Sequence, residues 1–155
     1  MAMSKIEQRL AELGVVLPQP VAPVANYVPF VRSGSSVYIS GQISIDADGG
    51  IKGTVGDDVD LETGKRAARL CAINLIAQMK AACDGDLDRV RRVVKLGGFV
   101  QGAADFIQIP AVVNGASDLM VEVFGDAGRH ARSAVGVYRL PLGFAVEVDA
   151  VVEIA

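Results

Sequence analysis

The sequence has few of the side chains on which most catalytic machinery depends: its 155 residues include one histidine, two cysteines and no tryptophan. The cysteines, Cys71 and Cys83, and the histidine, His130, do not follow the spacing of a metal-ligand motif, so we expect no metal site. A Ser-His-Asp triad would need His130 as its base, and no Gly-x-Ser-x-Gly motif is present. RNA cleavage by general acid and base usually uses two groups that titrate near neutral pH, and one histidine is too few.

Cofactor-binding and membrane-spanning motifs are also missing. The glycine-rich residues 96–102 match neither Gly-x-Gly-x-x-Gly nor a P-loop, and therefore indicate a strand that bends or packs closely. No run of about 18 apolar residues is present, and the first ten residues lack the apolar core of a signal peptide. We expect a cytoplasmic protein that needs no cofactor and has no membrane association.

The two cysteines are expected to be free. Cys71 and Cys83 lie in one predicted helix, and a separation of twelve residues is about 18 Å of helical rise. A disulfide requires Cα atoms within about 7 Å of each other. Both cysteines therefore read as small, buried apolar residues in a reducing compartment.

Positive charge is scarce as well. The net charge is −3, and the only candidate basic patch is formed by Lys65, Arg66 and Arg69 on one predicted helix, where a solvated face explains it. We therefore expect no nucleic-acid partner. Apolar residues make up 51% of the chain and charged residues 21%, so surplus apolar surface is expected to cover contacts between subunits.

The most informative stretch is the last one, residues 129–155. From Phe144 to Ile154 apolar residues alternate with polar ones, as in a strand with one buried face. Pro141 and Gly143 predict a chain reversal that joins this strand to the preceding one as an antiparallel pair. Arg132 opens the first strand and Glu147 lies in the second, near one end of the same sheet. The two form either a small polar site or, more simply, a cross-strand salt bridge.

Periodicity predicts the remaining elements. We predict a short capped helix over residues 4–13. The proline-rich residues 17–23 are predicted to form an extended connector. A hairpin turns at residues 33–35, helices cover residues 61–82 and 110–124, and a strand covers residues 90–100. This order predicts an α+β fold, with a mixed sheet and two long helices on one face. We assign residues 1–21 to the helix and connector, and residues 22–155 to the folded domain.

Three blocks of residues follow one another in a recognisable order. The first block is Tyr27 followed by residues 38–42 (YISGQ), and the second is Val113-Asn114. The third is residues 131–150, ARSAVGVYRLPLGFAVEVDA, which carries Arg132 and Glu147. Together the three blocks resemble the RidA/YjgF family, also called the endoribonuclease L-PSP family, whose members include imine deaminases. The resemblance implies a chorismate-mutase-like fold and a homotrimer with sites between its subunits.

The resemblance also implies a function and roles for individual residues. It implies hydrolysis of small enamines or imines (2-imino acids) to 2-keto acids and ammonia, with no cofactor. Arg132 would bind the substrate carboxylate and Glu147 would position and activate water as the catalytic residue. Tyr27 and Ser40 would line the substrate pocket, and Asn114 would support it.

Three features depart from the common family pattern and indicate a longer subfamily. The segment between Asn114 and Phe124 is about three residues longer, Ala134 stands where many members carry cysteine, and the N-terminal helix is additional. Two functions from different classes therefore remain open, an imine deaminase and a non-catalytic trimer that binds small carboxylates. Glu147 favours the enzyme, since binding alone would need only Arg132. An endoribonuclease is a distant third.

Overall fold

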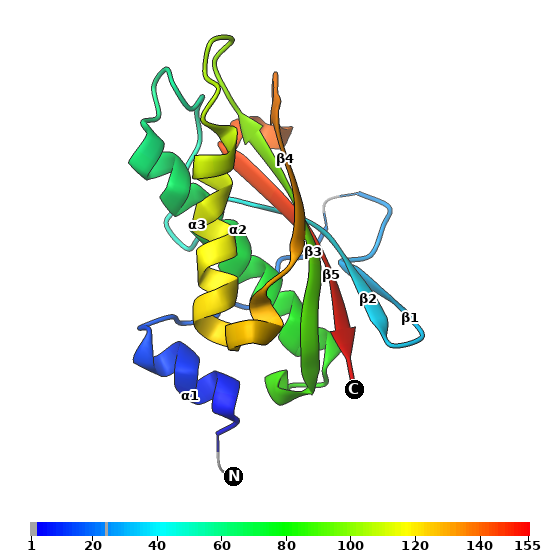
Figure 1. Ribbon diagram of the computed structural model, residues 1–155. Helices are drawn as coiled ribbons and strands as arrows, with labels where there is room; N and C mark the ends of the chain where they lie inside the picture. Colours follow the sequence, from blue (N-terminus) through cyan, green and yellow to red (C-terminus); the bar gives the residue numbers. More distant parts are fainter. Residues whose placement is uncertain (1–2, 24) are drawn as a thin grey trace.

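One mixed sheet organises the computed structural model, which describes residues 3–23 and 25–155. Within these residues the strand order is β1-β2-β5-β3-β4, with β3 and β4 parallel and the other neighbours antiparallel. The strands are β1 (Phe30–Ser33), β2 (Ser36–Ile43), β3 (Val90–Gln101), β4 (Ala131–Val137) and β5 (Val146–Ile154). The two long helices, α2 (Leu61–Ala82) and α3 (Ile109–Phe124), cover one face of the sheet (Figure 1). The predicted α+β fold class is thus confirmed.

The helices begin and end at the residues that the sequence signals indicated. The N-cap of α2 is Asp60, whose carboxylate accepts a hydrogen bond from the Thr63 backbone N–H at 2.8 Å. Pro110 lies in the first turn of α3, and Gly125, with a φ of 63°, ends that helix. Helix α2 packs its apolar stripe against β5 and β2, and α3 packs against β3 and β4. Cys71 and Cys83 are free and buried, as predicted.

The predicted antiparallel pair of residues 131–137 and 146–154 is wrong, because β3 lies between β4 and β5. The chain does reverse near Pro141, where Leu142 and Gly143 have φ values of 60° and 76°. However, the connection bonds to another segment: the Gly53 N–H donates to the Gly143 carbonyl at 2.9 Å, and the Ala145 N–H to that of Ile51 at 3.1 Å. Through these bonds the chain between β4 and β5 crosses the end of β3, so that β5 pairs with β3 on the side opposite β4.

The N-terminal segment packs on the rest of the molecule. Helix α1 (Lys5–Glu12) is capped by Ser4, and its first free N–H groups donate to the Asp88 carboxylate at 3.1 Å. Leu10 is 2% exposed and belongs to the main core. The connector that follows is held to α2, because the Gln78 side-chain amide donates to the Val21 carbonyl at 2.9 Å. None of the helices among the described residues is long and apolar enough to cross a membrane.

Close packing of α2 on α3 depends on one glycine. A Cβ atom at Gly115 of α3 would overlap the backbone carbonyl of Lys65 in α2. We expect Gly115→Ala to lower the free energy of unfolding by about 2 kcal/mol, because neither backbone can move without disturbing the core. Denaturant unfolding measures this. The control is Gly64→Ala in α2, where the added methyl would meet only side chains, at 3.3 Å and beyond. An equal loss in both variants would contradict the explanation.

Candidate functional site

A cavity of about 360 Å³ lies where the N-terminal connector meets β2, β5 and the connection after β4. Most of its wall is apolar, and polar side chains reach it from Tyr27, Ser40, Gln42 and Glu147. Three of the predicted site residues therefore share one cavity. Its volume suits a small molecule and not a polymer.

A local irregularity in β2 shapes this cavity. The register between β2 and β5 shifts between Ile39 and Gln42, which leaves Ser40 and Gly41 outside the regular ladder. The Ser40 hydroxyl donates to the Val28 carbonyl at 2.8 Å and so holds the loop that carries Tyr27. A Cβ atom at position 41 would lie 2.6 Å from a carboxylate oxygen of Glu147, so any larger residue there would displace that carboxylate from its present position.

Glu147 is the electrostatically unusual group of the cavity. Partial burial raises the pKa of its carboxyl, and the negative charge of Asp149, two residues along the same face, raises the pKa further. None of the ion pairs among the described residues involves Glu147. A half-buried carboxylate with a raised pKa and no ion-pair partner among the described residues is a stronger proton acceptor than an ordinary exposed glutamate.

The raised pKa also predicts how stability depends on pH. Because folded Glu147 holds its proton more tightly than the unfolded chain, stability is fully present below the ordinary pKa of 4.5 and is lost as pH rises through the folded pKa. We therefore expect Glu147→Gln to raise the melting temperature at neutral pH and to flatten this decline, as thermal unfolding from about pH 2 to 8 would measure. A lower melting temperature at neutral pH would contradict the assignment.

A carboxylate with the opposite shift gives an internal check on that measurement. The Thr63 N–H holds the pKa of Asp60 below its ordinary value of 3.8. Asp60 therefore contributes stability that is present above that value and lost as pH falls through the folded pKa. Glu147 and Asp60 change the stability in opposite directions and in separate pH ranges. Glu147→Gln should therefore leave the loss of stability below pH 3.8 unchanged.

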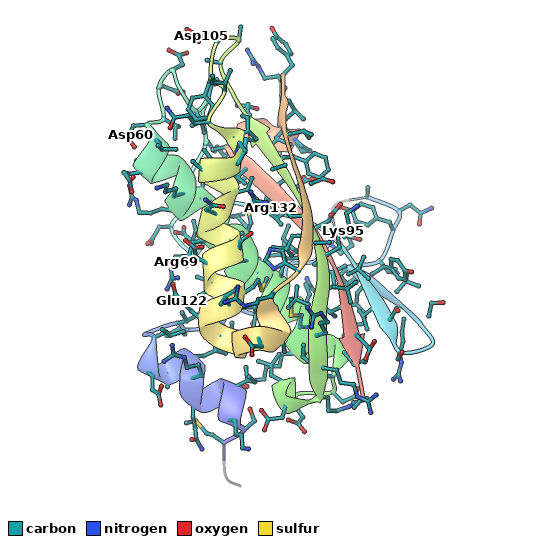
Figure 2. All side chains as sticks on the ribbon, in the orientation of Figure 1. Asp60, Arg69, Lys95, Asp105, Glu122 and Arg132 are labelled. Atoms are coloured by element: carbon teal, nitrogen blue, oxygen red, sulfur yellow. The ribbon has the colours of Figure 1, made fainter. Side chains whose placement is uncertain are left out.

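The other two predicted site residues form a separate group at the edge of the sheet. Arg132 on β4 donates through Nη1 to the Asn114 side-chain oxygen at 2.8 Å and to the Ser117 hydroxyl at 3.1 Å. Both partners lie on α3, and Figure 2 shows Arg132 on the side of the sheet that faces this helix. Two polar residues on one helix therefore hold the guanidinium in place.

Arg132 and Glu147 lie on opposite faces of the sheet. Arg132 pairs in register with the buried Leu96 and contacts α3, whereas Glu147 pairs with Phe99 and faces the cavity on the uncovered side. The predicted salt bridge between them is wrong. Within one chain the structure brings together Tyr27, Ser40 and Glu147 on one side, and Asn114 and Arg132 on the other.

Sequence reasoning missed two polar residues of this group: Ser117, which contacts Arg132, and His130, which contacts Ser117. Ser117 follows Asn114 by three residues, so both lie on the same face of α3. His130 bonds to Ser117 at 2.8 Å, although it reads in the sequence as an isolated histidine. The helical spacing from Asn114 to Ser117 was a signal for the first of these contacts; the second depends on the tertiary fold.

Metal and nucleic-acid sites find no support in the part of the chain that is described. Its His, Cys, Asp and Glu side chains form no group of three or more that could hold a metal ion. The candidate basic patch is internally paired: Lys65 contacts Glu62 at 3.4 Å, Arg69 contacts Glu122 at 4.0 Å, and Arg66 donates to the Thr63 hydroxyl. Figure 2 labels Arg69 and Glu122 beside each other on the outer side of the helices.

The mixed sheet with two helices on one face is the chorismate-mutase-like architecture, here with a small-molecule cavity on the uncovered side. The family model described as YjgF/chorismate_mutase-like, which also carries an endoribonuclease label, matches residues 7–153. The chain belongs to the RidA/YjgF family.

Individual relatives cover nearly the whole chain. The crystal structure of Atu1372 from Agrobacterium tumefaciens is 50% identical, covers 97% of this chain and 92% of its own, and has a TM-score of 0.91. Protein TCP17 of Trypanosoma cruzi is 48% identical over 99% of this chain and 96% of its own length. A 2-iminobutanoate/2-iminopropanoate deaminase of Dermatophagoides farinae is 31% identical over 88% of this chain and 90% of its own.

Proposed function

We propose that this protein hydrolyses small 2-imino acids to 2-keto acids and ammonia. The observation that carries the proposal is the half-buried carboxylate of Glu147, with its raised pKa, in a cavity of small-molecule size. The similarity to a 2-iminobutanoate/2-iminopropanoate deaminase supports the same chemistry. An imine carbon next to a carboxylate is already electrophilic, so the enzyme needs only to hold the acid and direct one water.

The reaction assigns a proton-transfer role to Glu147. Its carboxylate accepts a proton from water as the oxygen bonds to the imine carbon and the C=N π electrons move to nitrogen. Glu147 then delivers that proton to the nitrogen, which gives a neutral carbinolamine. The same carboxylate takes the hydroxyl hydrogen of the carbinolamine and passes it to the nitrogen, so the C–N bond breaks and ammonia leaves as the C=O bond forms. A raised pKa suits a group that must first accept a proton and then release it.

Arg132 is proposed to bind the substrate carboxylate. A guanidinium offers paired N–H donors that match the two oxygens of a carboxylate. Asn114 orients Arg132, while Tyr27 and Ser40 line the cavity beside Glu147. The apolar wall of the cavity accommodates a short aliphatic side chain on the substrate.

Because Arg132 and Glu147 lie on opposite faces within one chain, the proposed site requires a second copy. We propose a homotrimer in which Arg132 of one subunit reaches the Glu147 cavity of its neighbour. The uncovered face of the sheet is suited to such contact, because Val31, Tyr38 and Val135 are about half exposed on it, at 53%, 53% and 47%. Burial of these side chains between subunits would remove apolar surface from water.

A trimer that binds small carboxylates without turnover is the second candidate, since Arg132 and the cavity suffice for binding. An endoribonuclease is the least supported function: the net charge is −3 and the basic side chains of α2 have partners within the chain. We accordingly propose no nucleic-acid partner.

The test of the proposed function is release of 2-keto acid from an imine made in place. An amino-acid oxidase supplies a short-chain 2-imino acid, and semicarbazide competes for it by trapping. The active enzyme should lower the yield of trapped imine. If the yield stays unchanged for small and bulky imines, while 2-keto acids still protect the protein from thermal unfolding, the binding function replaces the enzymatic one.

A further inference from the structure

Four groups form a chain of hydrogen bonds that ends at Arg132. The Gly128 carbonyl lies 2.6 Å from Nδ1 of His130, and Nε2 of the same ring lies 2.8 Å from the Ser117 hydroxyl. The Ser117 oxygen in turn lies 3.1 Å from Nη1 of Arg132. His130 and Ser117 are both partly buried.

With a neutral His130 ring, the chemistry of the two ends gives every bond in this chain a direction. A carbonyl only accepts, so Nδ1 of His130 carries a hydrogen and donates to Gly128. In the neutral ring Nε2 is then an acceptor, and it receives the hydroxyl hydrogen of Ser117. The Ser117 oxygen is left with lone pairs, one of which accepts from the Arg132 guanidinium.

This direction decides which edge of Arg132 is available. The two hydrogens of Nη1 are used by Asn114 and Ser117, at 2.8 and 3.1 Å. Nη2 has only a long contact of 3.5 Å to the Pro110 carbonyl, and Nε has no partner among the residues described. The free edge is therefore the one formed by Nε and Nη2, which matches a carboxylate bidentately.

We infer that His130 is a positioning residue: acting through Ser117, it holds Arg132 with its Nε and Nη2 edge free for a carboxylate. Without an acceptor at Nε2, the Ser117 hydroxyl would turn to a backbone carbonyl one turn earlier in α3, as helical serines commonly do. The Ser117 oxygen would then no longer accept the hydrogen bond from Nη1 of Arg132. The inference rests on the proposed function for the ligand, but the hydrogen-bond chain is testable without any ligand.

The first experiment uses NMR on the ligand-free protein to determine the tautomer of the His130 ring and the rotation rate of the Arg132 guanidinium. His130 is the only histidine, so a long-range ¹H–¹⁵N spectrum shows a single imidazole. We expect the tautomer with hydrogen on Nδ1 and a bare Nε2. We also expect slow rotation about the Nε–Cζ bond of Arg132, whose signals are assigned by their loss in Arg132→Ala. A ring with hydrogen on Nε2, or a freely rotating guanidinium, would overturn the inference.

Two isosteric variants separate the acceptor from the bulk of the ring. In His130→Gln the amide oxygen lies where Nε2 was, so it can still accept from Ser117. In His130→Asn the amide nitrogen replaces Nδ1 and still donates to Gly128, but nothing reaches Ser117. The control is Arg129→Gln, because the exposed Arg129 side chain pairs only with Asp126, at 3.4 Å, within the described chain.

The expected result is an effect on binding that follows the acceptor. For a small 2-keto acid, measured by calorimetry on the whole protein, His130→Asn should raise Kd about fivefold, the loss of one neutral hydrogen bond. It should also speed the Arg132 rotation. His130→Gln should stay close to wild type in both measurements. Equal behaviour of the two variants, whether both weakened or both unaffected, would overturn the inference.

Failure of the inference is distinguishable from failure of the proposed function. If Arg132→Ala abolishes 2-keto acid binding while His130→Asn preserves both affinity and slow rotation, only the inference fails. If the wild type binds no 2-keto acid, the proposed function fails, and the tautomer and the rotation of Arg132 still decide the role of His130.

Discussion

Arg132→Ala is expected to remove most imine hydrolysis, lowering kcat/KM more than tenfold. Truncating one partner of a desolvated, charge-assisted pair typically costs about 2–5 kcal/mol, which exceeds one order of magnitude in binding. The loss should appear mainly in KM, because the guanidinium holds the carboxylate in the ground state and the transition state alike. The semicarbazide competition assay measures both constants.

Arg132→Lys is the informative companion of the alanine variant. Lysine keeps the charge, but an ammonium is a point charge that cannot donate in parallel to both carboxylate oxygens. An ammonium that bonds to Asn114 and Ser117 also has no second pair of donors left for the substrate carboxylate. We expect it to fail nearly as fully as alanine. Wild-type efficiency in the lysine variant would show that charge alone suffices, and would contradict bidentate binding.

Local signals in the sequence predicted the helices and strands because their causes are local. The cap at Asp60, the glycine at 125 and the alternation in β5 act within a few residues, and each was confirmed. Which strands pair with one another was harder to predict, because it depends on residues far apart in the sequence. β3, α3 and β4 form a crossover unit that places two parallel strands side by side, so β4 occupies the edge and β3 separates it from β5. The short connection from β4 to β5 favoured a hairpin instead.

The same error hid the arrangement of the site. In β4 the alternation is weak: Val135 is about half exposed, while Arg132 packs toward α3. A strand whose apolar residue faces outward and whose charged residue faces inward does not reveal its buried face. The sequence therefore predicted the residues Arg132 and Glu147 through a family resemblance, but not that they lie on opposite faces of one sheet.

That separation leads to the prediction with the largest qualitative effect: two inactive variants should restore activity when mixed. Arg132→Ala lacks the proposed carboxylate-binding group, and Glu147→Gln keeps the shape of its side chain but loses the proposed base. Glu147→Gln alone should lower turnover while leaving 2-keto acid binding largely intact, because Arg132 still holds the ligand. If it turns over as well as wild type, the role of Glu147 is wrong.

In a mixed trimer, an intact site forms where a subunit that carries Arg132 meets a neighbour that carries Glu147. When the variants are co-expressed in equal amounts and mix at random, about one quarter of the sites have both groups. Activity should therefore rise from near zero to about a quarter of wild type. A site formed within one chain would stay inactive at every ratio of these two variants.

The matched control mixes wild type with the double variant that carries both substitutions. A site shared between subunits needs two wild-type neighbours, which again gives about one quarter of full activity, whereas a site within one chain would give about one half. The two mixtures should thus agree for a shared site and differ for a separate one. Light scattering on each mixture provides the remaining check, because a mass near 16.2 kDa, that of one chain, would contradict both the trimer and the shared site.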